Sequence, residues 1–198
     1  MNYLAHLHLA DQTDTSYVGS LLGDFVKGNV ATMAVPTDLK IGIQLHRLVD
    51  SFTDQHPIVL DLKSKLPEHR KYGGIILDVL FDYLLAKNFG QYHPMALEQF
   101  SAHCYDNLPV DNEIMSPRFI QTISNMKQMD WLTSYGDIDT IKRVLMRIST
   151  RLTRPVALEN AVDWFRSEGA IEFNNFDDFY CDLVAYAQRE AHRLADRY

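Results

Sequence analysis

The order of apolar and polar positions along the chain predicts a protein made of α-helices. Segments with apolar residues at helical spacing alternate with Ser, Asp, Pro and Gly, which commonly begin or end helices. Strand signals are weak, since alternating runs of β-branched residues are few and no Asn-Gly hairpin turn occurs. The pattern therefore predicts a single all-α domain over residues 1–198, with roughly eight to ten helices.

Proline, glycine and short polar residues place the expected helix boundaries. We expect helices from Ser16 to about Lys27, from Pro36 to about Asp54, from Pro57 to before Pro67, from Tyr72 to about Phe89 and from Asp137 to about Leu152. Pro94, Pro117 and Pro155 mark further starts, and the last helix is expected over about Phe173 to Arg197. Gly28 and Gly90 are the predicted stops of two of these helices.

The segment from Ile75 to Ala86 is apolar nearly all round, which predicts a buried helix. Its only charged residues are Asp78 and Asp82, one turn apart on a single stripe. A buried carboxylate is costly unless it is paired or binds a metal, and two on one stripe raise that cost. A shared cation is the first interpretation. The alternative is a stripe that reaches solvent or meets arginines of a neighbouring helix.

Two other helices offer acids in a similar setting. Asp24 interrupts an apolar run, and Gly19 and Gly23 in the same segment would let another backbone approach closely. Asp24 is therefore a candidate ligand or, alternatively, a buried helix-cap acceptor. His46 and Asp50 lie one turn apart, so they can hold one ion together. The same stripe, which continues to Asp54, is also typical of a solvated helix face.

Histidines complete the candidate metal chemistry. His6 and His8 are two positions apart and point in different directions, so at most one is expected in a shared site. Each is alternatively a hydrogen-bonded core histidine. Imidazole with several carboxylates and no thiolate suits Mn²⁺, Mg²⁺ or Fe²⁺ better than structural zinc. Such a site activates water and binds phosphate, and Arg47, next to His46, is placed to stabilise phosphoryl oxygens.

Charge and composition exclude several classes. The 198 residues carry a net charge of −7, which argues against a general nucleic-acid-binding protein. No apolar run approaches the ~20 residues of a membrane span, so we expect no membrane insertion. The two cysteines are far apart in the chain, and no basic segment precedes the apolar N-terminus. A reducing, cytoplasmic location is therefore expected.

One segment reverses the acidic balance. Residues 140–155 contain five basic and no acidic residues, a local charge of +5, whereas the rest of the chain carries −12. Arg143, Arg147 and Arg151 share one helix face, which is suited to an acidic partner. Lys63 and Arg70 belong to a second basic candidate for that partner. The alternative is a solvated face paired with the acidic C-terminal segment.

Four segments carry a resemblance to a known family: NYLAHLHLA from Asn2, LLGDFVKG from Leu21, HRLVDSFTDQHP from His46 and LDVLFDYLL from Leu77. They resemble the acyl carrier protein phosphodiesterases, a divergent branch of the HD-type phosphohydrolases. The resemblance implies a helical, HD-like bundle and a Mn²⁺-dependent enzyme. Such enzymes hydrolyse 4′-phosphopantetheine from holo-acyl carrier protein, a strongly acidic protein. No histidine here is followed by Asp, so the HD ligand pair itself is not carried over.

The resemblance and the residue patterns together predict the site. We expect the metal to be held by Asp24, His46, Asp50 and Asp78, with His6 as a further ligand. Arg47 would stabilise the phosphoryl oxygens, and Asp82, Asp54 or His8 would orient water or protonate the departing serine oxygen. Two alternatives stay open: an HD-like phosphohydrolase acting on a nucleotide or another small phosphoester, and a non-catalytic helical protein that binds an acidic partner.

Overall fold

Helices account for the regular structure of every described part of the chain. The structure, a computed structural model, describes residues 1–66, 70–111, 113–154, 156–167 and 169–198, and no strand occurs among them. The α-helices are α1 (Tyr3–Gln12), α2 (Tyr17–Leu22), α3 (Thr37–Gln55), α4 (Pro57–Lys65), α5 (Gly73–Lys87), α6 (Phe89–Tyr92), α7 (Leu97–Asp106), α8 (Pro117–Gln128), α9 (Trp131–Ser134), α10 (Ile138–Ser149), α11 (Asn160–Ser167) and α12 (Phe176–Arg197). Three short 3-10 helices join them: η1 (Val30–Thr32), η2 (Arg70–Tyr72) and η3 (Gly169–Phe173). The all-α prediction is confirmed.

Most predicted helix starts are confirmed. The Ser16 side chain accepts a hydrogen bond from the Gly19 backbone and caps α2, and Asp137 caps α10 through the N–H groups of Asp139 and Thr140. The described residues nevertheless contain twelve α-helices, more than the eight to ten expected. Two of them, α6 and α9, have four residues each. A single turn is too short for apolar periodicity to reveal.

Three predicted helix ends are wrong. The helix that begins after Ser16 ends at Leu22 and not near Lys27, because the chain turns at Gly23 into a loop. Gly28 lies in this loop with φ +94°, a conformation that favours glycine. Similarly, α5 ends at Lys87, and Gly90 lies inside the short α6 that follows. Helix α10 ends at Ser149 and not near Leu152, so Arg151 lies in the turn beyond it. Pro155, expected to open a helix, lies outside the described residues, and the next helix begins at Asn160.

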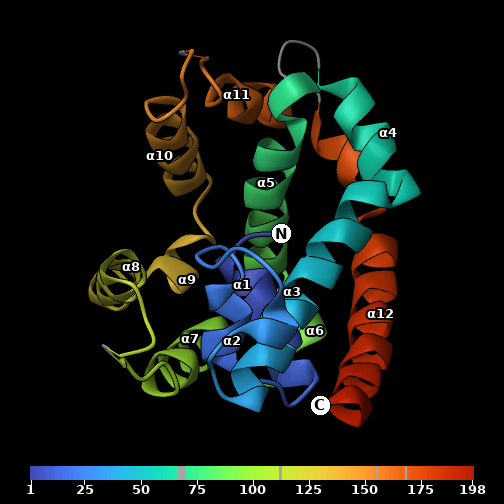
Figure 1. Ribbon diagram of the computed structural model, residues 1–198. Coiled ribbons are helices and arrows are strands. Elements are labelled where there is room, and N and C mark those ends of the chain that lie inside the picture. The colour runs from blue at the N-terminus through green and yellow to red at the C-terminus, as the bar shows by residue number, and fades with distance from the viewer. Residues whose placement is uncertain (67–69, 112, 155, 168) are drawn as a thin grey trace.

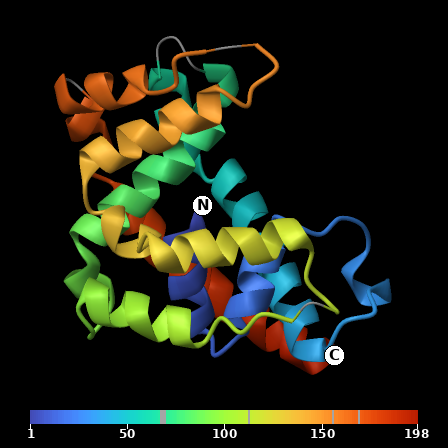
Figure 2. The same cartoon turned by 90° about the vertical axis from the view of Figure 1, so that its left-hand side faces the viewer.

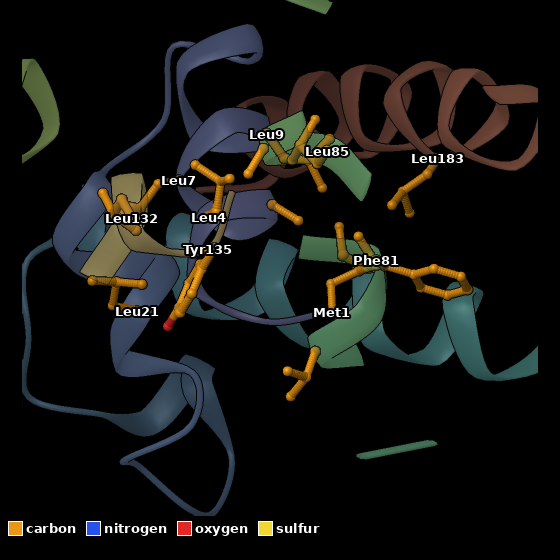
Figure 3. Packing of buried hydrophobic residues seen from close by; sticks show 14 of the residues in the cluster. Met1, Leu4, Leu7, Leu9, Leu21, Phe81, Leu85, Leu132, Tyr135 and Leu183 are labelled. Carbon is orange, nitrogen blue, oxygen red and sulfur yellow. The ribbon is translucent and has the colours of Figure 1, made fainter. Parts of the chain in front are cut away.

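The first helix lies at the centre of the molecule. Figure 1 shows α1 and α5 in the middle, with α3 and α12 on one side and α8, α9 and α10 on the other. Seven of the ten residues of α1 are buried. Met1, Leu4 and Phe81 belong to one apolar cluster together with residues of α2, α9 and α12 (Figure 3). Burial of α1 on all sides explains why its polar side chains need partners inside the protein.

Helices α2 and α3 pack with their backbones in contact. A Cβ at Gly19 would lie 2.9 Å from the Leu39 carbonyl oxygen, and one at Gly42 would lie 2.8 Å from the Gly19 Cα. The predicted close approach at Gly19 is therefore confirmed, and it brings the loop after α2 against α3. None of the described helices is both long and apolar enough to cross a membrane.

Candidate metal centre

Two histidines and a carboxylate converge between α1 and α3. His6, His46 and Asp50 each offer one ligand atom, and these atoms lie within 4.8 Å of one another. Asp50 joins them, since its Oδ1 is 3.1 Å from His6 Nε2 and its Oδ2 is 3.2 Å from His46 Nε2. The two imidazole rings are stacked with centroids 3.9 Å apart. Both Nε2 atoms therefore face the same carboxylate.

Two further carboxylates flank this group. Asp24 Oδ1 lies 3.5 Å from His46 Nε2. The amino group of Met1 donates a hydrogen bond of 2.8 Å to Asp78 Oδ1 and lies 3.4 Å from Asp50 Oδ1. The structure thus brings together all five residues predicted as metal ligands, directly or through this amino group. We call His6, Asp24, His46, Asp50 and Asp78 the ligand cluster.

Glycine makes room for the ligand cluster at one point. A Cβ at Gly23 would lie 2.2 Å from two ring carbons of His46, so no larger residue fits there without displacing the imidazole. Gly23 has an ordinary right-handed φ of −48°, and its role is therefore steric and not conformational. The close packing explains how Asp24, the next residue, comes beside His46.

The two stacked histidines differ in charge. Burial and the neighbouring His46 lower the pKa of His6 to about 4. Burial also lowers the pKa of His46, but its hydrogen bonds to Asp24 and Asp50 outweigh that effect and raise the pKa to about 9. The pKa of Asp50 lies below its usual range despite burial, because His46 and His6 both contact it. At neutral pH the pair therefore carries one positive charge, next to several negative ones.

The donor set fits a divalent cation. Two imidazole nitrogens and carboxylate oxygens suit Mn²⁺, Fe²⁺ or Mg²⁺, and the group found among the described residues includes no cysteine. Nδ1 of His46 is buried and has no hydrogen-bond partner among the described residues. The ligand cluster holds three carboxylates, and one cation, the Met1 ammonium, is already bound between Asp50 and Asp78. The negative charge that this ammonium leaves unbalanced favours a further cation.

Arg47 and Asp54, predicted as catalytic, have partners outside the ligand cluster. Arg47 donates hydrogen bonds to the carbonyl oxygens of Val26 at 2.9 Å and Gly28 at 2.7 Å, so it anchors the loop that begins with Gly23 and Asp24. Asp54 pairs with Lys63 at 2.7 Å and is 67% exposed. These contacts do not test a catalytic role, which stays a prediction for both residues.

Asp82 and His8, also predicted as catalytic, are buried among structural partners. Asp82 accepts hydrogen bonds from the backbone N–H groups of Leu4 at 2.9 Å and Ala5 at 3.2 Å, and burial raises its pKa to about 7. His8 Nδ1 lies 2.8 Å from the Tyr180 hydroxyl, and its Nε2 lies 3.2 Å from a backbone carbonyl oxygen. Of the two histidines in α1, therefore, only His6 lies in the ligand cluster.

The residues predicted to bind a partner are divided between two places. Arg143, Arg147 and Arg151 all line one groove beside α10. Lys63 lies elsewhere, in its ion pair with Asp54. The side chain of Arg70 lies outside the described part of the chain.

Sequence patterns missed the partners of the two acids on α5. Asp78 meets the Met1 ammonium, and Asp82 meets the first N–H groups of α1. These N–H groups belong to the unsatisfied N-terminus of the helix, where a carboxylate is favoured. The sequence indicates the start of α1 only in part. Asn2 is a favourable N-cap residue, but its side chain makes no capping hydrogen bond, and Asp82 accepts from the first N–H groups instead.

Comparisons with known proteins agree on one family. A sequence profile of the family described as acyl carrier protein phosphodiesterase matches residues 1–183. A relative from Enterobacter sp. (strain 638) with that name is 39% identical over 193 residues, covering 96% of this chain and 99% of the relative. Relatives of the same name from Salmonella dublin and Escherichia coli (strain ATCC 8739) are 36% and 34% identical, each covering 96% of this chain and the whole relative. No solved structure matches.

Proposed function

Because the chain belongs to the acyl carrier protein phosphodiesterase family, we propose that it removes the prosthetic group of that carrier. In this reaction water cleaves the phosphodiester between 4′-phosphopantetheine and the serine of holo-acyl carrier protein, giving the apo-protein and free 4′-phosphopantetheine. The ligand cluster is the observation that supports a metal-dependent hydrolysis. The HD-type relationship stays a prediction.

We infer that His6, His46 and Asp50 hold the metal, with Asp24 and Asp78 completing its surroundings. Mn²⁺ is the ion expected, with Mg²⁺ and Fe²⁺ as alternatives. When bound, such an ion polarises a phosphoryl oxygen and lowers the pKa of a water ligand. The proton on His46 must leave before that nitrogen can bind a metal, since its pKa lies near 9.

Other residues of the chain hold the ligands in place or serve the leaving group. Arg47 fixes the loop that carries Asp24, and Asp82 fixes the start of α1, which carries His6. Of the three predicted proton donors, Asp82 and His8 are almost fully buried, whereas Asp54 is exposed one turn beyond Asp50. We therefore assign Asp54 the proton transfer: its carboxylate, paired with Lys63, takes a proton from the attacking water and delivers it to the departing serine oxygen.

The partner is recognised by charge in this proposal. Arg143 and Arg147 lie one turn apart on α10, Arg151 follows just beyond its end, and the carrier protein is acidic. Long-range attraction then increases the rate of encounter and falls with ionic strength.

Purified protein tests this function in two steps. Metal analysis should find a bound divalent cation, and incubation with holo-acyl carrier protein should lower the mass of the carrier by that of its prosthetic group. Asp24→Ala and Asp78→Ala should abolish the mass change while far-UV circular dichroism stays helical. Full activity in both variants would contradict the ligand assignment.

The same experiment separates the alternatives. Phosphate release from a panel of nucleotides, with no change in carrier mass, would favour a small-phosphoester hydrolase. Binding of the carrier without metal and without conversion would favour a non-catalytic protein. Either result would overturn the proposed function.

A further inference from the structure

A groove of about 860 Å³ lies between α8, α9, α10 and the start of α1. Helices α8, α9 and α10 lie on the side of the molecule that faces the viewer in Figure 2. Residues at five positions of α10, among them Val144 and Ile148, line the groove over at least two turns. The volume lies within the range of about 300–1,000 Å³ that is typical of sites for small molecules and cofactors. We call it the arginine groove.

Its charge is the opposite of that of the ligand cluster. Arg118 of α8 lines it together with Arg143, Arg147 and Arg151, and no acidic residue is among the described residues of its lining. Within the described chain, Arg118, Arg147 and Arg151 make no ion pair. By contrast, Lys142 on the same helix but outside the groove pairs with Asp163 at 2.7 Å. In a protein of net charge −7, such a set of arginines favours an anionic ligand.

The arginine groove begins where the ligand cluster ends. Asn2 and Tyr3 line it and directly follow Met1, whose amino group contacts Asp50 and Asp78. Phe25 lines it as well and directly follows Asp24. Burial raises the pKa of Tyr3 to about 12; the charge of Asp24 adds to this rise, and the charges of Arg118 and Arg151 oppose it. One tyrosine is therefore within electrostatic reach of both the acids and the arginines.

The walls of the groove combine apolar and hydrogen-bonding groups. Tyr3 and Trp131 are stacked with ring centroids 6.1 Å apart, and Val144 and Ile148 add aliphatic surface. Asn125 supplies a side-chain amide. A slender chain of methylene and methyl groups with amides and an anionic end matches this lining. An acidic helix of a protein partner does not match the aromatic and aliphatic part.

We propose that the arginine groove binds the phosphopantetheine arm, so that the phosphodiester, its only charged group, lies between the ligand cluster and Arg118 and the uncharged pantetheine extends beside α10. This inference rests on the proposed function, since it names the place where that substrate lies. It assigns Arg118, a residue that no sequence pattern indicated, to the anionic end of the arm. Trp131 and Val144 then contact the uncharged part.

Binding measurements test the inference separately from catalysis. Val144→Trp fills the groove, and Met146→Trp is the matched control because Met146 is exposed on the same helix outside the groove. We expect 4′-phosphopantetheine, titrated calorimetrically, to bind wild type and Met146→Trp equally and Val144→Trp at least about 10-fold more weakly. The affinity for apo-carrier, which lacks the arm, should be the same in all three.

A second pair of variants tests the inference in case Val144→Trp fails to fold. Arg118→Gln alters an exposed side chain and should weaken 4′-phosphopantetheine binding severalfold, whereas Arg193→Gln on α12 should not. Equal binding of the arm by Val144→Trp and Met146→Trp would overturn the inference. So would a parallel loss of apo-carrier affinity, which would assign the groove to the carrier protein itself. Wild type that binds the arm but leaves holo-carrier unconverted would contradict only the proposed function.

Discussion

The ligand cluster and the arginine groove are neighbours with opposite properties. In the ligand cluster, acids and imidazoles contact one another at 3.1–3.5 Å, and glycines hold the helices close around them. In the arginine groove, three of four arginines have no acidic partner among the described residues, and all four side chains are exposed to solvent. The first arrangement is suited to a small cation, and the second to an extended anion.

The two regions differ in what balances their charge, a bound cation in one and water in the other. In the ligand cluster, three acids with 37–51% exposed side chains lie close around two buried histidines. Their excess negative charge therefore favours a cation at close range, and the Met1 ammonium already supplies one. The arginines of the groove are exposed, so water can solvate them until a ligand arrives. Substitutions in the ligand cluster should therefore abolish activity, and those in the groove should mainly weaken binding.

The largest effect is expected from Asp50→Asn, which keeps the shape of the residue that joins both histidines but removes its charge. Removing a mere hydrogen-bond partner of a metal ligand costs roughly 10- to 100-fold, so losing this carboxylate should lower kcat/KM at least about 100-fold. Asp182→Asn is the matched control, since Asp182 contacts His56 at 3.4 Å outside the ligand cluster. Equal activity of the two variants would remove Asp50 from the centre.

His8 sharpens the comparison because it shares α1 with His6 but lies in the core. Burial lowers the pKa of His8 to about 4 from 6.5, so the neutral form stabilises the fold above pH 6.5 and this contribution is lost as the pH falls toward 4. Over that range the unfolding free energy of wild type should fall about 3 kcal/mol more than that of His8→Gln. Chemical denaturation at several pH values measures it. If the unfolding free energies of wild type and His8→Gln changed in parallel with pH, His8 would not be a buried neutral histidine. The control is His192→Gln, which alters an exposed residue of α12 and should follow wild type.

Gly23→Ala tests the packing that surrounds the ligand cluster. The added Cβ would lie 2.2 Å from the His46 ring, so the imidazole must move. We expect a roughly 10- to 100-fold loss of metal affinity, measured by titration with Mn²⁺. Gly90→Ala is the control, because a Cβ there meets nothing within 4 Å. Wild-type affinity in Gly23→Ala would show that His46 is not a ligand.

The smallest effect belongs to the groove rim. Arg143→Glu with Arg147→Glu should raise KM for holo-carrier about 10-fold and leave kcat nearly unchanged, because both side chains are exposed and act by attraction. Steady-state kinetics at two ionic strengths would show the difference shrinking as salt rises. A KM like that of wild type would remove α10 from the docking surface.

Sequence patterns predicted the fold class and most helix starts because both depend on local chemistry. Ser16 and Asp137 cap the helices expected of them. The end of α2 was predicted too late, because the turn at Gly23 serves the packing against His46, a contact that no local pattern reveals.

The candidate ligands were also predictable, since acids inside apolar helices stand out in the sequence. Their geometry was not. Asp78 and Asp82 resemble each other in sequence, yet one meets an ammonium beside the ligand cluster and the other the N-terminus of α1. The role proposed for Arg118 depends on residues of several helices lining one groove, so it could be inferred only from the structure.

The central claim is that a divalent metal is bound by His6, His46 and Asp50. Anomalous X-ray scattering from crystals grown with Mn²⁺ measures this directly. We expect one strong peak about 2 Å from both Nε2 atoms and a carboxylate oxygen of Asp50. A peak at other residues, or none in crystals whose dissolved protein converts holo-carrier to apo-carrier, would contradict it.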